Sequence, residues 1–188
     1  MARSKKIRVA VIGAGNTAVD AATISKRLGA EQVLILYRRG EEDMTAYDFE
    51  YEFAKNEGIE YRFFTSPVRI FGNHHVEAIE CVRTQLGNPD PSGRRMSVPI
   101  SGSEFTIPVD MVVRATGQHK YLQLLDNLGV KHDKGRVLIE PGTGRTSNSK
   151  IFAGGDCVLA LHEMAATVIA AEHGKIAAKG IDRLLMGG

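Results

Sequence analysis

A glycine-rich turn near the N-terminus constrains the fold more than any other feature of this sequence. Residues 13–18 form a GxGxxA motif that follows an apolar segment, Ile7–Ile12, and opens an amphipathic one, Asn16–Leu28. A second apolar segment, Gln32–Tyr37, comes next. Strand, helix and strand within about 30 residues is the spacing of a parallel βαβ unit. We therefore predict an α/β fold of the Rossmann type, built on a parallel sheet.

The residue types in this turn suit a loop that binds a dinucleotide. Gly13 makes the tight turn out of the strand, Gly15 lets the backbone approach a pyrophosphate, and Ala18 lets the helix lie close to the sheet. The N-terminus of the helix offers N–H groups and a partial positive charge to the phosphates. A glycine turn in another kind of α/β fold is the alternative. The predicted pyrophosphate-binding residues are Gly13, Ala14, Gly15, Asn16 and Thr17.

The end of the second apolar segment indicates which dinucleotide is bound. An NAD-binding unit places an Asp or Glu there to bond the ribose 2′-hydroxyl, whereas an NADP-binding unit has an arginine nearby. This chain carries Arg38 and Arg39 at that point, and two guanidiniums suit a 2′-phosphate through bidentate, charge-assisted hydrogen bonds. We therefore predict NADPH in preference to NADH. The alternative is a solvated arginine pair, because the acidic residues 41–43 follow and could pair with it.

The next segments predict the rest of this domain. A helix over Ala46–Asn56 and a strand over Ile59–Thr65 extend the βαβ pattern. Short apolar segments separated by turn-rich stretches then indicate an antiparallel β-meander rather than a further βα unit. The predicted strands of this meander are Val68–Phe71, Val76–Thr84 and Met96–Ile100, with a turn over residues 87–93.

The composition changes after Gly117, which divides the chain into residues 1–117 and 118–188. An apolar strand over Val109–Ala115 ends at Thr116-Gly117 and completes the first domain. Beyond it the sequence predicts a short strand, a strand that enters a tight turn, and a long Ala-rich helix. These elements cover Val137–Glu140, Ile151–Asp156 and His162–Met186.

Composition excludes several classes of protein. The net charge is +2 and the basic residues are scattered, so a nucleic-acid partner is not indicated. The longest apolar stretches fall short of the roughly 20 residues of a membrane span, and there is no signal-peptide pattern, so we expect a cytoplasmic protein without a membrane partner. Cys81 and Cys157 are not in a CxxC pair. We predict no metal site, and expect both cysteines to be small buried residues, with a disulfide as the alternative.

The motifs taken together resemble a known family. The matching segments, in order, are Val11–Asp20, Tyr37–Arg39, Met44–Ala46, Cys81–Thr84, Gly93–Arg95, Pro99–Phe105, Ala115–Gln118 and Ile151–Cys157. They resemble the glutamate synthase small subunit family, which includes the flavin-containing half of dihydropyrimidine dehydrogenase and related electron-bifurcating ferredoxin–NADP oxidoreductases. Thr45 departs from this family's usual Met-Pro-Ala.

The resemblance implies a fold in which an NADPH-binding domain is inserted into an FAD-binding domain. Residues 1–117 would be the NAD(P)H-binding domain, and residues 118–188 a partial second dinucleotide-binding domain, the C-terminal segment of the FAD-binding one. The N-terminal FAD half would be missing, or supplied by another chain. We accordingly expect this chain alone to hold no stoichiometric flavin.

The resemblance also assigns further cofactor contacts. Asp156 would bond FAD, and the backbone at Thr167 and Val168 would face the flavin; the matching motifs add Thr116, Gly117 and Gly155. From the residues alone, a Gly-Gly-Asp turn can present a carboxylate to a ligand hydroxyl, or can serve a local turn. No catalytic side chain is predicted, because hydride transfer between nicotinamide and flavin depends on stacking and orientation. His162 and His173 are expected on the helix surface.

The function implied is hydride transfer between NADPH and FAD, with electrons passing to iron–sulfur centres or a partner chain. A nucleotide-binding or regulatory module without turnover is the alternative. The apolar face of the last helix needs cover, since burial of such side chains is worth roughly 1.5–3 kcal/mol each. We expect a homodimer or repacking onto residues 1–117 to cover Met164, Val168, Ile169 and Ile176.

Overall fold

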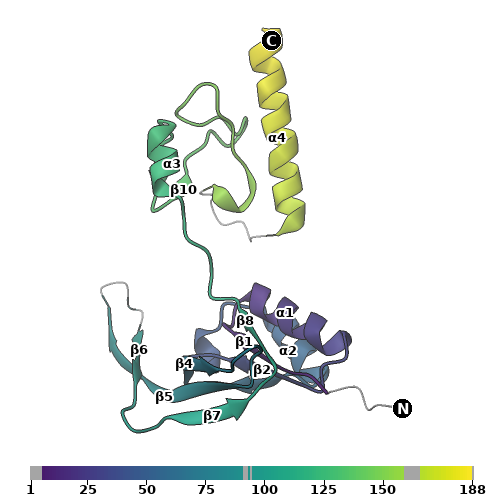
Figure 1. The fold of residues 1–188 in the computed structure, drawn as a ribbon. Coiled ribbons are helices and arrows are strands. Elements are labelled where there is room, and N and C mark those ends of the chain that lie inside the picture. The colour runs from purple at the N-terminus through teal and green to yellow at the C-terminus, as the bar shows by residue number, and fades with distance from the viewer. Residues whose placement is uncertain (1–5, 91–92, 94, 159–165, 188) are drawn as a thin grey trace. The chain divides into compact units, whose positions relative to one another are not determined.

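The computed structural model describes residues 6–90, 93, 95–158 and 166–187. The chain divides into two compact units, Met1–Gly117 and Gln118–Gly188 (Figure 1). Within the described residues, no helix combines the length and the apolar character that crossing a membrane requires.

A four-stranded parallel sheet forms the centre of the first unit. Its strand order is β3-β2-β1-β8, and every neighbouring pair is parallel. This confirms the predicted α/β, Rossmann-like class. The strands are β1 (Arg8–Ile12), β2 (Gln32–Leu36), β3 (Glu60–Arg62) and β8 (Met111–Arg114).

Helices cover one face of this sheet. Alternate residues of β1 and β2, such as Val11 and Ile35, pack against small side chains of α1, Ala18 and Ala22, and against Ala54 of α2. The small residues let the helices lie close to the strands. The two helices are α1 (Asn16–Arg27) and α2 (Asp48–Asn56), and a short 3-10 turn, η1 (Glu41–Asp43), precedes α2.

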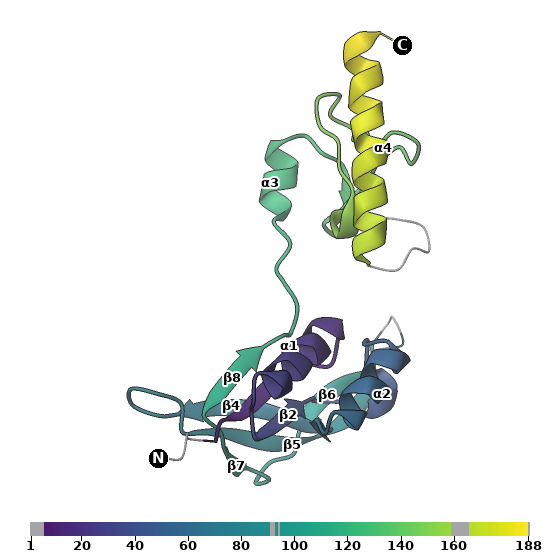
Figure 2. The same cartoon turned by 90° about the vertical axis from the view of Figure 1, so that its right-hand side faces the viewer.

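An antiparallel sheet covers the other face, so the first unit has three layers (Figures 1 and 2). Ala10, Leu34 and Leu36 of the parallel strands pack there against Ile79 and Cys81. With both faces covered, a ligand can reach the parallel strands where they end. The antiparallel strands are β4 (Thr65–Phe71), β5 (Ala78–Pro89), β6 (Arg95–Pro99) and β7 (Phe105–Pro108).

The antiparallel sheet differs in detail from the predicted meander. Strand β7, which the sequence did not predict, pairs with β5. Strand β5 continues to Pro89, through part of the segment predicted as a turn, because Pro89 is opposite Arg95 of β6. Strand β4 begins at Thr65 and includes Pro67, which is tolerated because β4 lies at the sheet edge and is bulged there.

Asp110, the acidic residue in an otherwise apolar segment, joins β1 to the segment before β8. Its carboxylate is 7% exposed and accepts hydrogen bonds from the Arg8 amide and Nε, both at 3.0 Å. The hydrogen bond to Asp110 raises the pKa of Arg8 above its ordinary value. The Asp110 charge is therefore paired, which makes it compatible with an otherwise apolar segment.

The second unit has a small core and little sheet. Three buried residues, Val130, Val137 and Val158, form its centre. The predicted strand over Val137–Glu140 is reduced to β10, and that over Ile151–Asp156 to one bridge at Phe152. Helix α3 was not predicted. The elements are α3 (Leu122–Asn127), β9 (His132–Asp133), β10 (Arg136–Val137), the 3-10 turn η2 (Gly155–Cys157) and α4 (Thr167–Met186).

The last helix begins later than predicted. Its first residue is Thr167, whereas the predicted start, His162, and the expected face residue Met164 lie outside the described residues. Val168 is 72% exposed, and Ile169 and Ile176 are half-buried. Cover of this face by a homodimer stays a prediction.

The two glycines inside α4 provide a matched test of packing in the second unit. A Cβ on Gly180 would lie 2.5 Å from the Thr143 carbonyl oxygen, whereas a Cβ on Gly174 would meet nothing within 4 Å. We expect Gly180→Ala to lower the free energy of unfolding by about 1–3 kcal/mol, and Gly174→Ala to raise it by about 0.5–1 kcal/mol. Urea unfolding followed by circular dichroism measures both, and shifts of the same sign would contradict this packing.

Candidate nucleotide-binding site

A cavity of about 620 Å³ lies in the first unit, at the carboxyl ends of three parallel strands. Ile12 and Leu36 end β1 and β2, and Ala115 follows β8. In open α/β sheets, ligands bind outside the carboxyl ends of the strands. The lining residues are Ile12, Gly13, Ala14, Gly15, Thr17, Leu36, Tyr37, Arg38, Thr45, Thr65, Ser66, Pro67, Ala115, Thr116 and Gly117.

Most of the cofactor-binding residues predicted in the first unit meet at this cavity. The glycine turn, Arg38 and the Thr116-Gly117 pair come from three distant parts of the sequence and line one space. Asn16 and Arg39 do not line it. Sequence reasoning missed Tyr37, Thr45 and residues 65–67. Tyr37 and Thr45 carried a signal, since both lie in segments that match the family, whereas residues 65–67 carried none.

Gly13 occupies a position that no other residue type fits. Its φ of +127° lies in the region that favours glycine, and a Cβ there would lie 2.3 Å from the Ala115 carbonyl oxygen. The Gly13 amide donates to the Leu36 carbonyl at 3.1 Å. The turn is therefore held against the ends of β2 and β8 at once.

The turn presents backbone amides that have no acceptor among the described residues. The amides of Ala18 and Val19 both donate to the Gly15 carbonyl, at 2.8 and 3.2 Å. Within the described part of the chain, the amides of residues 14–17 donate no hydrogen bond to another residue. Unsatisfied amides at the start of a helix are groups with which proteins commonly bind anions.

A neighbouring segment fixes the turn from the other side. The amides of Thr45 and Ala46 both donate to the Ala14 carbonyl at 3.2 Å, and the Tyr47 amide donates to Asn16 Oδ1 at 3.0 Å. The Asn16 side-chain oxygen thus holds this segment, and the Asn16 backbone amide stays available to a ligand. Thr45 Oγ1 lies 3.1 Å from where a Cβ on Gly15 would be.

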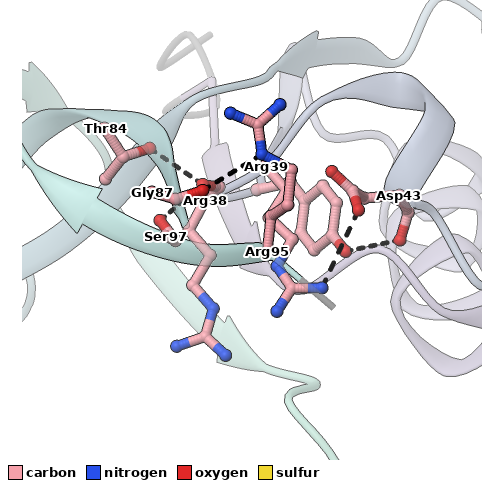
Figure 3. A network of polar contacts seen from close by, with 8 residues as sticks. Arg38, Arg39, Asp43, Thr84, Gly87, Arg95 and Ser97 are labelled. Carbon is pink, nitrogen blue, oxygen red and sulfur yellow. Dashed lines mark hydrogen bonds and ion pairs between the residues drawn. The ribbon is translucent and has the colours of Figure 1, made fainter. Parts of the chain in front are cut away.

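The two predicted arginines point into different surroundings (Figure 3). Arg38 is exposed and lines the cavity. The Arg39 side chain is 5% exposed, and its Nη1 lies 3.8 Å from Asp43 Oδ1. Asp43 is one of the acidic residues whose pairing with the arginines the sequence had left open, and Tyr37 donates its hydroxyl to the Asp43 carbonyl at 2.7 Å. The structure thus brings Arg38, rather than the pair, to the cavity.

The predicted flavin-contacting residues lie together in the second unit. Gly155 and Asp156 form part of η2, and Thr167 and Val168 begin α4, which packs on η2. Asp156, Thr167 and Val168 are exposed. His173 is half-buried rather than on the open helix surface, because its Nδ1 accepts the Gly155 amide at 3.0 Å.

The two cysteines differ in their surroundings. Cys81 is buried as expected, and burial raises the pKa of its thiol to about 11. Cys157 is exposed, which corrects the expectation of a buried residue: it lies in the surface turn η2, where its Sγ donates to the Gly154 carbonyl. Both are free thiols. Across the described residues, no group of three or more side chains could hold a metal ion.

The parallel sheet and the cavity at its carboxyl edge define an α/β protein of the dinucleotide-binding class. The chain belongs to the pyridine nucleotide-disulphide oxidoreductase family, whose model matches residues 2–174. Together with the relatives below, this match confirms the resemblance inferred from the motifs.

Curated relatives include two enzyme subunits. The chain is 41% identical over 182 residues to the NADP(+)-dependent formate dehydrogenase subunit beta of Moorella thermoacetica, covering 96% of this chain and 25% of that protein. It is 39% identical over 181 residues to the glutamate synthase (NADPH) small chain of Escherichia coli K12, covering 93% and 38%. The chain thus spans between a quarter and two fifths of these two relatives.

Solved structures share the fold. Thioredoxin reductase from T. acidophilum has a TM-score of 0.71 at 22% identity, over 93% of this chain and 51% of that one. FprA from Mycobacterium tuberculosis in complex with NADPH has a TM-score of 0.63 at 19% identity, over 95% and 53%. At these identities the likeness concerns the fold alone.

Two glycines with positive φ provide a matched test of the turn. Gly29 has a φ of +98°, and a Cβ added there would meet nothing within 4 Å. A Cβ added to Gly13 would in addition clash with the Ala115 carbonyl oxygen. We expect Gly29→Ala to cost about 1–3 kcal/mol of backbone strain, and Gly13→Ala to cost about 1–3 kcal/mol more through the clash. Urea unfolding of both variants measures the difference. Equal losses would show that the Ala115 contact does not constrain the turn.

Proposed function

We propose that residues 1–117 bind NADPH, and that the chain is the NADPH-binding portion of a flavin-dependent oxidoreductase of the glutamate synthase small-subunit type. The observation that carries this proposal is that Arg38 lines the same cavity as Ala14, Gly15 and Thr17, three of the four turn residues with unsatisfied amides. The amides suit a diphosphate, and the Arg38 side chain suits a further phosphate on the same molecule.

The pyrophosphate is proposed to lie on the amides of Ala14, Gly15, Asn16 and Thr17. These groups fit an anion because they are already oriented, and the absence of a Cβ on Gly15 leaves room for close approach. The α1 N-terminus adds a partial positive charge at the same place. Gly13 contributes through the shape of the turn, and Thr116 and Gly117 through the cavity wall.

The preference for NADPH is proposed to come from Arg38, which is exposed at the cavity and carries a permanent charge. The names of the two enzyme-subunit relatives, which specify NADP(+) and NADPH, support this choice. The predicted contact of Arg39 with the 2′-phosphate stays a prediction. The guanidinium of Arg39 is buried beside Asp43, although its Nε has no hydrogen-bond partner within the described structure.

The chemistry proposed is transfer of a hydride, which NADPH carries and a flavin accepts when both are bound. This chain's own residues bind and orient the nucleotide. No acid or base is required, because stacking and orientation of the two rings set the rate of such a transfer. The contacts of Gly155, Asp156, Thr167 and Val168 with FAD are part of this proposal, supported by their proximity around η2 and the start of α4.

A partner chain is also part of the proposal. The relatives are named as a subunit beta and as a small chain, which supports an assembly in which other polypeptides receive the electrons. Iron–sulfur centres are the acceptors that the resemblance implies. A homodimer that covers α4 is the further form of assembly we propose.

Single arginine variants test the assignment of the 2′-phosphate. We expect Arg38→Ala to weaken NADPH binding on the order of 10- to 100-fold, because a charge-assisted contact is lost, while NADH binding is unchanged. Isothermal titration calorimetry on the 188-residue chain measures both affinities. Equal loss of NADPH and NADH affinity, or no loss, would contradict the role of Arg38.

Two further variants complete this experiment. Arg69→Ala removes an exposed charge that pairs with Glu80 in the antiparallel sheet. We expect it to leave the ratio of NADPH affinity to NADH affinity (the NADPH:NADH ratio) unchanged. Arg39→Ala decides the open assignment: a lower melting temperature with an unchanged ratio indicates a structural pair with Asp43, whereas a changed ratio indicates a phosphate contact.

The flavin content tests the proposal for residues 118–188. We expect the purified chain to lack a visible flavin band, because the second unit supplies only a small group of contacts around η2 and α4. Absorption spectroscopy measures this, and one flavin per chain would contradict it. NADPH oxidation with an artificial acceptor and added FAD then distinguishes an enzyme from a module that binds the nucleotide without turnover.

A further inference from the structure

Three consecutive carbonyl groups after β2 are all bonded by distant segments of the same unit. The Tyr37 carbonyl accepts the Thr65 amide at 2.9 Å, and the Arg39 carbonyl accepts the Phe64 amide at 3.0 Å. These bonds hold the backbone on both sides of Arg38. The chain leaving β2 is therefore not a loose loop, although it carries the residues that face the cavity.

The Arg38 carbonyl between them accepts two hydroxyl groups (Figure 3). Thr84 Oγ1, from β5, donates at 2.8 Å, and Ser97 Oγ, from β6, donates at 2.7 Å. Thr84 is 5% exposed and Ser97 is half-buried. Two strands of the antiparallel sheet thus converge on one oxygen atom of the residue that lines the cavity.

These bonds hold the peptide group that lies between the two arginines. Successive side chains of an extended backbone point to opposite sides, and here Arg38 is exposed while Arg39 is buried beside Asp43. A rotation of the peptide group between them would break both hydroxyl bonds. The orientation of Arg38 therefore depends on groups that do not line the cavity themselves.

We propose that Thr84 and Ser97 are positioning residues for cofactor selectivity: their hydroxyls fix the Arg38 carbonyl and so aim the Arg38 guanidinium at the 2′-phosphate. This inference rests on the proposed function, in which Arg38 binds that phosphate. It assigns the antiparallel sheet a role in discriminating NADPH from NADH as well as in covering the parallel sheet.

The test removes each hydroxyl while keeping the shape of the side chain. Ser97→Ala and Thr84→Val are compared with the unmodified chain for NADPH and NADH affinity by calorimetry. We expect each variant to weaken NADPH binding about three- to tenfold, the worth of one hydrogen bond, with NADH binding unchanged. Thr84→Ser, which restores a hydroxyl, returns the NADPH:NADH ratio to its original value.

A serine in the connection between β6 and β7 is the control. Ser103 Oγ accepts the Arg83 amide at 3.0 Å and donates to the Ile100 carbonyl at 2.6 Å, with no bond to Arg38. We expect Ser103→Ala to leave the ratio unchanged even where it lowers the melting temperature. A general loosening of the sheet would instead alter the ratio in the Ser103 variant as well.

The outcomes separate this inference from the proposed function. If Ser97→Ala and Thr84→Val weaken both nucleotides equally, or neither, the positioning role is overturned while Arg38→Ala still changes the ratio. If Arg38→Ala leaves the ratio unchanged, the 2′-phosphate assignment itself fails. Ser97 is half-buried, so its alanine variant is expected to fold and keeps the test decisive should the Thr84 variant not fold.

Discussion

The close approach of Gly13 to the Ala115 carbonyl is the constraint on which the site depends. It is possible only because β1 and β8, far apart in sequence, pair in parallel and end at the same edge of the sheet. The Ala115 amide also donates to the Ile12 carbonyl at 2.8 Å. A side chain at Gly13 would push these two strand ends apart, and the cavity would lose one of its walls.

The three layers of the first unit leave the carboxyl ends of the parallel strands as the place where a ligand can bind. Helices bury one face of the parallel sheet and the antiparallel strands bury the other. Because both faces are closed, amides and side chains that need a polar partner collect at the carboxyl edge. The unsatisfied amides of residues 14–17 need a ligand or water as acceptor there, and we propose that a diphosphate fills this role.

The local part of this architecture could be predicted from the sequence. The glycine turn and the apolar segments around it have the spacing of a βαβ unit, which predicted the parallel sheet and the position of the turn. The division of roles between Arg38 and Arg39 could not be predicted. It depends on hydrogen bonds from Thr84 and Ser97 and on the Asp43 pair, and no local pattern shows which arginine a distant strand will hold.

Other differences between the predicted and the observed structure also come from contacts with distant segments. The cavity wall at residues 65–67 belongs to an edge strand, β4, which runs through the point where the sequence predicted one strand to end at Thr65 and another to begin at Val68. Strand β5 continues through a turn-like sequence because β6 supplies its partner. In the second unit, a core of three valines gives only short strands, so apolar segments that looked like strands remain irregular. Long-range pairing, rather than local preference, decides each case.

The central claim is that backbone amides of the glycine turn bind the diphosphate of NADPH. Nuclear magnetic resonance of the isotope-labelled chain during an NADPH titration tests it directly, since amides that gain a phosphate partner shift strongly. The account predicts the largest changes at the amides of Ala14, Gly15, Asn16 and Thr17. Saturable binding that leaves these four signals unmoved, with the changes in another part of the chain, would contradict it.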